Sequence, residues 1–554
     1  MFSSKENINI LTALLVESGV RDAVVCPGSR NSAIVHNLKV RASIRCHGVT
    51  DERSAGFYAL GISQATGSPV VVCVTSGTAL LNLLPAVAEA WYQHRPLVVV
   101  SGDRPPQWID QLDGQTLPQN DALGRFVRKA VTLPEPHNDE ERWYCNRLVN
   151  EALLACRRYG GAPVHINVPI SEPLFDYSVE RLPEERLVEW FGPETTTVGR
   201  HMLARFEQAQ RPMVVIGQMK EHDLPRGLCE DLWAAGYVVL HERLSSGDGT
   251  ATWLDEMVAR VEDDDRYLPD FILYMGDTLV SKRARRWLRR ATKAECWTVG
   301  PDGEVRDVLM NLTGVVAAEP RDVLMQIQPH QDNDYRDLWK AVRHEVETFH
   351  HHWQPPYSQL LAVKRLEERL AREGDGVVVH YANSTSVRLG NIFAGHYIYC
   401  NRGVNGIEGS LSTAAGYALA TGKTVYCVIG DLSFFYDQNA LWNQYLGGNL
   451  RILLLNNGGG GIFHQLGGLE RSPACDDFVT ASHHTTAEGI CLENNITYYS
   501  ADNAEALDSL LDALTVSQST RPVLLEVHTD ARWDAQLFQE YIKTIKIWKE
   551  NGKR

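Results

Sequence analysis

Several features that would decide a class of function are missing from the 554 residues of this chain. No two of the 11 cysteines form a Cys-x-x-Cys pair, and Cys26, Cys73 and Cys427 lie inside strand-like runs, which favours reduced, buried thiols over disulfides or zinc ligands. No apolar run approaches the length of a membrane span, and the N-terminal region has neither a long apolar core nor a cleavage-site pattern. We therefore expect a cytoplasmic protein with no membrane segment.

An excess of basic residues is also missing. Lysine and arginine number 54 against 69 aspartates and glutamates, so the formal net charge is −15. This balance argues against nucleic acid or an anionic membrane as a partner. A small anionic ligand would have to be bound by locally placed arginines. The hydrophobic content of 44% is that of a globular protein, and the length predicts three domains of ordinary size.

One stretch, residues 424–463, organises the rest of the chain. Thr424–Ile429 and Arg451–Leu455 are short aliphatic runs, and the segment between them is long enough for a helical crossover joining two parallel strands. Because parallel strands end at the same edge of a sheet, we expect the turns Gly430-Asp431 and Asn456-Asn457 to meet there.

These two turns carry the ligands of a hard cation. A carboxylate from Asp431, an amide oxygen from Asn457 and a backbone carbonyl in 458–461 form an oxygen-only set too sparse to enclose a cation alone. Mg²⁺ is bound in this way when phosphate oxygens and water complete its shell. Ser433 and the first amides of the crossover helix would face the same phosphates. The alternative is a pair of ordinary turns with no ligand.

The remaining chain predicts an α/β fold of three doubly wound domains with mainly parallel sheets. Helical and strand-like segments alternate through three domains expected at 1–182, 183–352 and 353–554. No Gly-x-Gly-x-x-Gly follows a strand of the middle domain, so no dinucleotide is predicted there. The segment 350–356, with three adjacent histidines before two prolines, is expected to be a solvated linker.

The pair Gly430-Asp431 and Asn456-Asn457 resembles the diphosphate-binding signature of thiamine diphosphate enzymes. Leu432 stands where glycine is usual in that superfamily. The resemblance implies thiamine diphosphate held through Mg²⁺ or Mn²⁺, with the third domain binding the diphosphate and the first the pyrimidine. It also implies a site between domains of different subunits, hence a homodimer at minimum and a tetramer as an option.

Glu52 is the candidate for activating such a cofactor. It follows a strand at the head of a helix, and a carboxylate in an apolar setting can share a proton with a ring nitrogen. A helix-start charge at Asp51 or Glu52 is an equally good interpretation of the residues alone. The resemblance favours catalysis, because Glu52 occupies the place of the activating glutamate of the family.

Several arginines sit in turns that follow predicted strands. Arg30, Arg104, Arg388 and Arg402 lie in Gly-, Ser- or Asn-rich turns, and the pair Lys282-Arg283 follows a middle-domain strand. Each could be an ordinary surface residue or half of an ion pair. Together they suggest a substrate with more than one carboxylate.

The motifs PGSRNS, TDERSAGFYALG, GDRPP, NSTSVR, NRGVNGIEGSLSTAAG and GDLSFFYD resemble the menaquinone-pathway branch of the thiamine diphosphate enzymes over nearly the whole chain. Members of that branch decarboxylate 2-oxoglutarate and add the remaining four-carbon unit to isochorismate in a 1,4-addition. The resemblance implies cofactor contacts from Glu52, Thr75, Ser76, Gly77, Ser384, Ile407, Gly430, Asp431, Leu432, Ser433, Asn457, Ile462 and Phe463. It implies metal ligands at Asp431, Asn457 and the Gly459 carbonyl.

Substrate contacts follow from the same resemblance. The part derived from 2-oxoglutarate would be held by Ser384, Arg388 and Arg402, and isochorismate by Ser29, Arg30, Arg104, Gln115, Lys282 and Arg283, with Ile462 and Phe463 at the reacting centre. The chain departs from the family at Gly114 and Gly458, where asparagine is frequent. The first departure makes the contacts of the 110–120 loop the least secure.

Two other functions compete with this one. A carboligase of the acetohydroxyacid synthase kind would use pyruvate and could bind FAD in the middle domain, but the basic pair Lys282-Arg283 argues against it. A non-catalytic sensor would keep the fold without needing Glu52.

Overall fold

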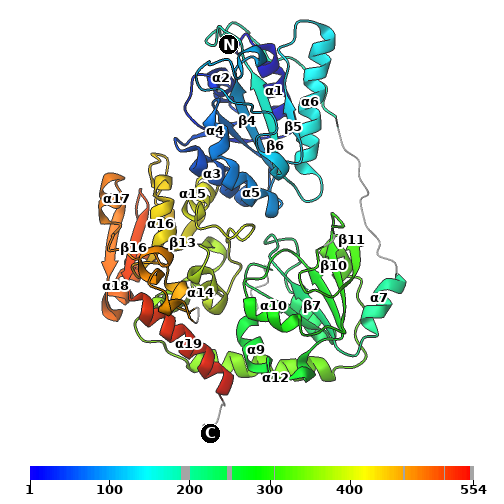
Figure 1. Cartoon of the computed structure of the whole chain (residues 1–554), viewed down its shortest axis with the longest axis vertical. Coiled ribbons are helices and arrows are strands. Elements are labelled where there is room, and N and C mark those ends of the chain that lie inside the picture. Colours follow the sequence, from blue (N-terminus) through cyan, green and yellow to red (C-terminus); the bar gives the residue numbers. More distant parts are fainter. Residues whose placement is uncertain (189–199, 246–252, 305, 466–467, 517, 549–554) are drawn as a thin grey trace.

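The computed structural model describes residues 1–188, 200–245, 253–304, 306–465, 468–516 and 518–548 (Figure 1). Within them the chain forms three sheets whose strand pairs are all parallel, each flanked by helices. The α/β class with three mainly parallel sheets is thereby confirmed. No described helix is both long and apolar enough to cross a membrane.

The first sheet has six strands in the order β2-β1-β3-β4-β6-β5. The strands are β1 (Asp22–Val25), β2 (Arg45–Gly48), β3 (Val70–Val74), β4 (Leu97–Asp103), β5 (Ala130–Thr132) and β6 (Val164–Pro169). The helices are α1 (Glu6–Glu17), α2 (Ser32–Val40), α3 (Glu52–Thr66), α4 (Thr78–Asn82), α5 (Leu84–Tyr92) and α6 (Asp139–Arg157). Every residue of β3 and β4 is buried, and accordingly β3 and the first four residues of β4 read as continuous apolar runs.

The middle sheet has five strands in the order β11-β10-β9-β7-β8. Its strands are β7 (Pro212–Ile216), β8 (Val238–His241), β9 (Phe271–Met275), β10 (Glu295–Gly300) and β11 (Leu312–Ala317). Its helices are α7 (Arg200–Glu207), α8 (Leu228–Ala234), α9 (Leu254–Val261), α10 (Lys282–Leu288), α11 (Pro320–Leu324) and α12 (Asp334–His352).

The third sheet has five strands in the order β12-β13-β14-β16-β15. Its strands are β12 (Val377–Tyr381), β13 (Thr424–Gly430), β14 (Leu450–Asn456), β15 (Thr497–Ala501) and β16 (Val523–His528). Its helices are α13 (Gln359–Leu370), α14 (Thr385–Phe393), α15 (Ser410–Ala420), α16 (Asp431–Tyr436), α17 (Glu488–Glu493), α18 (Ala504–Val516) and α19 (Ala531–Ile547). The predicted β–α–β unit is present, although α16 and the 3₁₀ turn Gln438–Leu441 are shorter than a full crossover helix.

The prediction of a solvated linker at 350–356 is wrong for its first residues, since His350–His352 form the last turn of α12. His351 and His352 are exposed, as expected for solvated histidines, whereas His350 is packed. The His350 ring stacks on Trp253 with centroids 4.7 Å apart, and its Nε2 lies 3.0 Å from the Tyr541 hydroxyl. Burial lowers the pKa of His350 to about 3, so this ring is neutral and belongs to the packing between the middle sheet and α19.

Helices α3 and α15 join the first sheet to the third, and they lie next to each other in Figure 1. The contact requires glycine. A Cβ atom on Gly61 would lie 2.0 Å from the Thr413 carbonyl oxygen, and one on Gly416 would lie 2.3 Å from the Tyr58 carbonyl oxygen. The two glycines thus let the helix backbones touch and fix how the two sheets sit.

Candidate active site

The two turns predicted to meet at the edge of the third sheet do meet. Asp431 begins α16 and is only 3% exposed. Its Oδ2 accepts hydrogen bonds from the backbone N–H groups of Asn457, at 3.2 Å, and Gly459, at 2.9 Å. Parallel pairing of β13 with β14 brings the strand ends together, as expected from the chain order.

The oxygen atoms at this edge suit a hard cation. The Asn457 Nδ2 donates to Asp534 at 3.2 Å, which leaves its Oδ1 as the atom that can bind a metal. Gly459 has a φ of +156°, and Gly458 one of +79°, conformations that L side chains rarely adopt. A carboxylate, an amide oxygen and a main-chain carbonyl are the donor set of Mg²⁺ or Mn²⁺, so the residues present fit the group.

One neighbour of Asp431 was not predicted. The His483 Nε2 lies 3.4 Å from the Asp431 Oδ2, and this carboxylate raises the pKa of His483. His483 also donates its backbone N–H to the Gly458 carbonyl at 2.8 Å. Its position 52 residues beyond Asp431 carries no spacing signal that links it to the turn.

Ser433 and Ile407, each predicted to contact the cofactor, lie next to each other. The Ser433 hydroxyl, on the first turn of α16 with Leu432, donates to the Ile407 carbonyl. The Ile407 side chain is 40% exposed, so it does not belong to the hydrophobic core. A bulky apolar side chain is thereby exposed next to the turn that begins at Gly430.

Glu52 is the first residue of α3, and Asp51 is its N-cap. The Asp51 Oδ1 accepts from the N–H groups of Arg53 and Ser54, so the capping role belongs to Asp51. The Glu52 Oε2 accepts from the Asn82 side chain at 3.3 Å, and no hydrogen bond to Oε1 is found among the residues that the structure describes. Asp51 is thus the helix-start acid that the sequence allowed, and catalysis by Glu52 stays a prediction.

The turns after β1 and β3 lie side by side where the first sheet reverses its strand order. A Cβ on Gly28 would lie 2.4 Å from that of Thr75, so only glycine allows this approach. Gln115 donates to the Ser76 carbonyl at 3.2 Å, and the Gly77 N–H donates to the Gln119 Oε1 at 2.7 Å. Gln119, which sequence reasoning missed, is buried and fixes the turn Thr75–Gly77.

The predicted substrate arginines of the first sheet have protein partners. Arg30 is buried, donates to the Ile170 carbonyl and lies 3.2 Å from the Glu172 carboxylate, while Ser29 beside it is exposed. Arg104 donates to the Gly114 carbonyl and pairs with Asp113 at 3.0 Å. Arg104 therefore folds the 110–115 loop onto the sheet edge, in addition to any contact with substrate.

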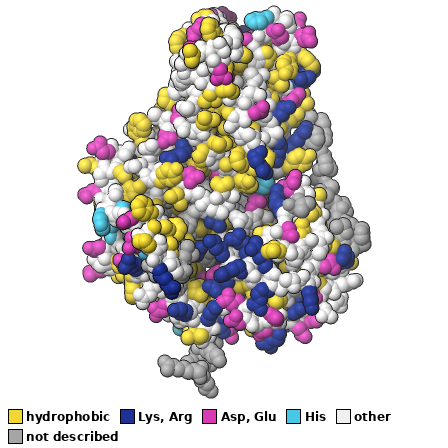
Figure 2. All heavy atoms as spheres, in the orientation of Figure 1, with side chains coloured by type: hydrophobic (Ala, Val, Ile, Leu, Met, Phe, Trp, Pro, Cys, Tyr) yellow, Lys and Arg dark blue, Asp and Glu magenta, His cyan; other side chains and the backbone are white. Residues whose placement is uncertain are grey.

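A basic pocket of about 560 Å³ lies between the middle and third sheets. Lys282 and Arg283 reach it from α10, Arg388 from α14, and Ile462 and Phe463 from the 3₁₀ turn after β14. Figure 2 shows basic side chains gathered in the hollow at the centre of the molecule. The structure thus brings together five predicted residues from two domains, within a protein of net charge −15.

Arg283 is half of an ion-pair network, as the alternative interpretation allowed. It lies 3.3 Å from Asp255 and 2.9 Å from Glu262. Arg388 forms no ion pair within the described part of the chain, and burial lowers its pKa, with Arg402 contributing to the shift. The charges of Arg388 and Arg402 therefore lie close enough to interact, and the charges of Asp255 and Glu242 oppose the lowering of the Arg388 pKa.

Ser384 and Arg402 are held by the buried Asn383. Ser384 has φ +73° and ψ −123°, a strained conformation for a residue with a side chain. The Arg402 Nη1 donates to the Asn383 Oδ1 at 3.0 Å, and the Asn383 Nδ2 donates to the carbonyls of Asn401 and Gly406. Hydrogen bonds of Asn383 thereby join the strained turn at Ser384 to the loop that carries Arg402.

Comparison with known proteins agrees with this geometry. Residues 8–123 match the family described as thiamine pyrophosphate enzyme, N-terminal TPP binding domain, and residues 188–377 match the middle domain of thiamine pyrophosphate. A 2-succinyl-5-enolpyruvyl-6-hydroxy-3-cyclohexene-1-carboxylate synthase of Bacteroides fragilis is 42% identical, covering 99% of this chain and 100% of the relative. Proteins of the same name from Phocaeicola vulgatus and Porphyromonas gingivalis are 42% and 32% identical, covering 99% and 98% of this chain and 99% and 98% of their own lengths.

Proposed function

The chain belongs to the family of 2-succinyl-5-enolpyruvyl-6-hydroxy-3-cyclohexene-1-carboxylate synthases, and on that premise we propose how its residues carry out the reaction. The enzyme decarboxylates 2-oxoglutarate and adds the remaining four-carbon unit to isochorismate in menaquinone biosynthesis. The observation that carries the proposal is the contact of Asp431 with Asn457 and Gly459, because it assembles a site for a metal-bound diphosphate.

Thiamine diphosphate, when bound, supplies the electron sink that makes loss of carbon dioxide possible. Asp431, the Asn457 Oδ1 and the Gly459 carbonyl would hold its diphosphate through Mg²⁺ or Mn²⁺. Thr75, Ser76 and Gly77 would contact it from the first sheet. The Glu52 Oε1 would hold a proton against the pyrimidine ring nitrogen, and Asn82 orients the carboxylate by donating to Oε2.

The basic pocket would orient the substrates. Arg388 and Arg402 would bind the carboxylates of the 2-oxoglutarate part together with Ser384, since planar guanidinium groups bind carboxylates in a bidentate manner. Lys282 and Arg283 would bind isochorismate, with Ser29, Arg30, Arg104 and Gln115 approaching from the first sheet. Ile462 and Phe463 would exclude water from the reacting carbon.

Each half of this site is built on its own sheet, Glu52 on the first and Asp431 on the third. We propose that the halves are completed across a homodimer, in the cytoplasm, with a tetramer as a further assembly. The carboligase of the acetohydroxyacid synthase kind is disfavoured by the family to which the chain belongs.

The test is an assay with both substrates. Purified protein with thiamine diphosphate and Mg²⁺ is expected to release carbon dioxide from 2-oxoglutarate faster when isochorismate is present, and to form the named product by mass spectrometry. Consumption of neither substrate, or turnover of pyruvate alone, would contradict the proposal.

A further inference from the structure

A pocket of about 580 Å³ is lined by α19 and by residues of the segment 464–477. His464 reaches it from the 3₁₀ turn Gly461–Gln465, and Cys475 and Asp476 reach it from the start of the π-helix Cys475–Val479. Helices of this kind are rare and are frequent at functional sites. None of the residues assigned above to cofactor or substrates lines this pocket.

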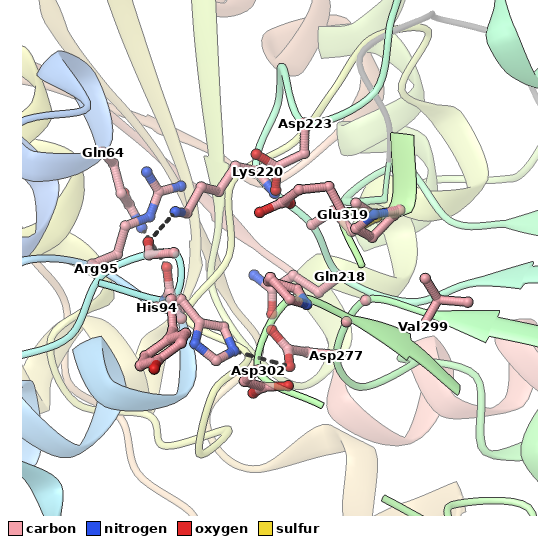
Figure 3. A pocket seen from close by; sticks show the side chains of 18 of the residues that line it. Gln64, His94, Arg95, Gln218, Lys220, Asp223, Asp277, Val299, Asp302 and Glu319 are labelled. Carbon is pink, nitrogen blue, oxygen red and sulfur yellow. Dashed lines mark hydrogen bonds and ion pairs between the residues drawn. The ribbon is translucent and has the colours of Figure 1, made fainter. Parts of the chain in front are cut away.

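Three possible metal ligands converge in this pocket. A ring nitrogen of His464, the Cys475 Sγ and an Asp476 carboxylate oxygen all lie within 4.8 Å of one another. Among the residues that the structure describes, this is the one group of three such side chains. The pocket in Figure 3 differs in this respect, because its His94 faces Asp277 at 3.6 Å and no third described ligand atom joins them.

The three side chains are available to a metal ion. Cys475 is a free cysteine, and within the described ranges neither its Sγ nor the His464 ring has a hydrogen-bond or ion-pair partner. Asp476 lies 3.0 Å from Arg532, but the two side chains are 52% and 73% exposed, and ion pairs between exposed side chains contribute little. A divalent cation can therefore replace Arg532 as the partner of Asp476.

The chemistry of the donor atoms selects the metal. Thiolate sulfur, imidazole nitrogen and carboxylate oxygen are ligands of Zn²⁺, which binds them at about 2.0 to 2.3 Å in a tetrahedron, with ligand atoms about 3.4 to 3.6 Å apart. The exposed Asp476 side chain can rotate to close the remaining difference. Mg²⁺ and Mn²⁺ prefer oxygen ligands such as those beside Asp431, so the two sites differ in the ion that they suit.

We propose that His464, Cys475 and Asp476 bind Zn²⁺, with water from the pocket as the fourth ligand. Cys475 binds as the thiolate, so its proton passes to the solvent when the metal enters. This site is separate from the oxygen-only site at Asp431 and goes beyond the proposed synthase activity.

The zinc ion would join two segments that border the proposed active site. His464 directly follows Phe463 in the turn Gly461–Gln465. Thr480, which ends the π-helix, accepts a hydrogen bond from the Gly460 N–H at 2.6 Å through its carbonyl. A metal bound to His464 and Cys475 adds a second link between this turn and the π-helix, and it therefore stabilises the folded arrangement of both.

The experiment is titration of the full-length protein with Co²⁺, a spectroscopic substitute for Zn²⁺, in buffer containing Mg²⁺. A thiolate-to-cobalt charge-transfer band is expected in the near ultraviolet, and one equivalent of Zn²⁺ per chain should displace it. Because a ligand set made only of oxygen cannot give this band, cobalt at Asp431 would not be mistaken for cobalt at Cys475.

Variants of the three ligands assign the band. Cys475→Ser should abolish it, whereas His464→Gln and Asp476→Asn should each weaken Co²⁺ binding at least tenfold. Cys46→Ser is the matched control, because Cys46 is a partly exposed free cysteine outside the pocket and its loss should leave the band unchanged. Zn²⁺ should also raise the melting temperature of the wild type but not that of Cys475→Ser.

Thermal unfolding without metal shows whether each variant is folded, and diffraction at the zinc absorption edge from wild-type crystals locates the ion if a variant is not. Absence of the band in the wild type, its survival in Cys475→Ser, or its loss in Cys46→Ser would overturn the proposal. Unchanged affinity in both His464→Gln and Asp476→Asn, or a zinc peak away from Cys475, would do the same. No measurement here depends on turnover, so a negative result would leave the proposed synthase activity unaffected.

Discussion

The carboxylate of Glu89 accepts a hydrogen bond from the backbone N–H of Val404 at 2.8 Å, and another from Gly403 at the same distance. Glu89 lies on α5 of the first sheet and is 1% exposed, whereas the two amides belong to the loop that carries Arg402 and Ile407. Gln93, one turn later, donates to Glu89 at 2.6 Å. A buried acid of one domain therefore positions a loop of another, the loop for which we propose substrate binding.

Replacing Glu89 with Gln should loosen this loop, because an amide has one oxygen for two N–H donors. We expect the KM for 2-oxoglutarate to rise about tenfold, equivalent to about 1.4 kcal/mol, with a smaller change in kcat. Steady-state kinetics of Glu89→Gln beside Glu151→Gln, a change on the partly exposed face of α6, measures this. An unchanged KM would mean that Glu89 has no positioning role.

Replacing Glu52 and replacing Asp51 should have different effects, the first on catalysis and the second on stability. Glu52→Gln removes the proton that the carboxyl shares with the cofactor, so kcat should fall by about 10² to 10⁴ while the melting temperature stays the same. Asp51→Ala removes the cap of α3 and should cost about 1 kcal/mol of stability. Full activity in Glu52→Gln would remove the acid from the mechanism.

The two ends of the basic pocket should respond to different substrates. Lys282→Met is expected to raise the KM for isochorismate roughly tenfold and to leave that for 2-oxoglutarate unchanged, since a charged contact is worth about 1.5 kcal/mol or more. Arg388→Gln should do the reverse. If either variant changed both KM values equally, the division of the pocket between the substrates would be wrong.

Glu256 makes the stability of the fold depend on pH. Burial, with Asp255 nearby, raises the pKa of this carboxyl to about 8, and the Tyr541 hydroxyl donates to it at 2.9 Å. Between about pH 4.5 and 8 the folded protein keeps a proton that the unfolded chain has released, so this group lowers stability as pH rises, by about 1.4 kcal/mol per pH unit. In denaturant unfolding, the free energy of unfolding of Glu256→Gln should fall less steeply with rising pH than that of the wild type over this window. Parallel curves for the two proteins would contradict the assignment.

The strands, and the meeting of the turns that carry Asp431 and Asn457, could be predicted because both follow from local sequence. Buried parallel strands such as Val70–Val74 read as unbroken apolar runs, and adjacent parallel strands place Asp431 and Asn457 at one edge. Partners from distant parts of the chain, such as His483 and Glu89, could not be found this way, because only the tertiary fold brings them to the site.

The sequence also could not predict which arginines form ion pairs. Arg283 belongs to an ion-pair network while Arg388, in the same pocket, has none in the part of the chain that is described, and nothing in their local motifs distinguishes them. Adjacent histidines before two prolines predict a solvated linker at 350–356, but helix α12 continues to His352 and packs His350 against Trp253.

The central claim is that Asp431, Asn457 and Gly459 together hold a metal-bound diphosphate. Crystals grown with thiamine diphosphate and Mn²⁺, measured by anomalous diffraction, test it most directly. The account predicts a manganese peak about 2.0 to 2.2 Å from an Asp431 carboxylate oxygen, the Asn457 Oδ1 and the Gly459 carbonyl. A peak elsewhere, for example at the cluster of His464, Cys475 and Asp476, with none beside Asp431, would contradict it.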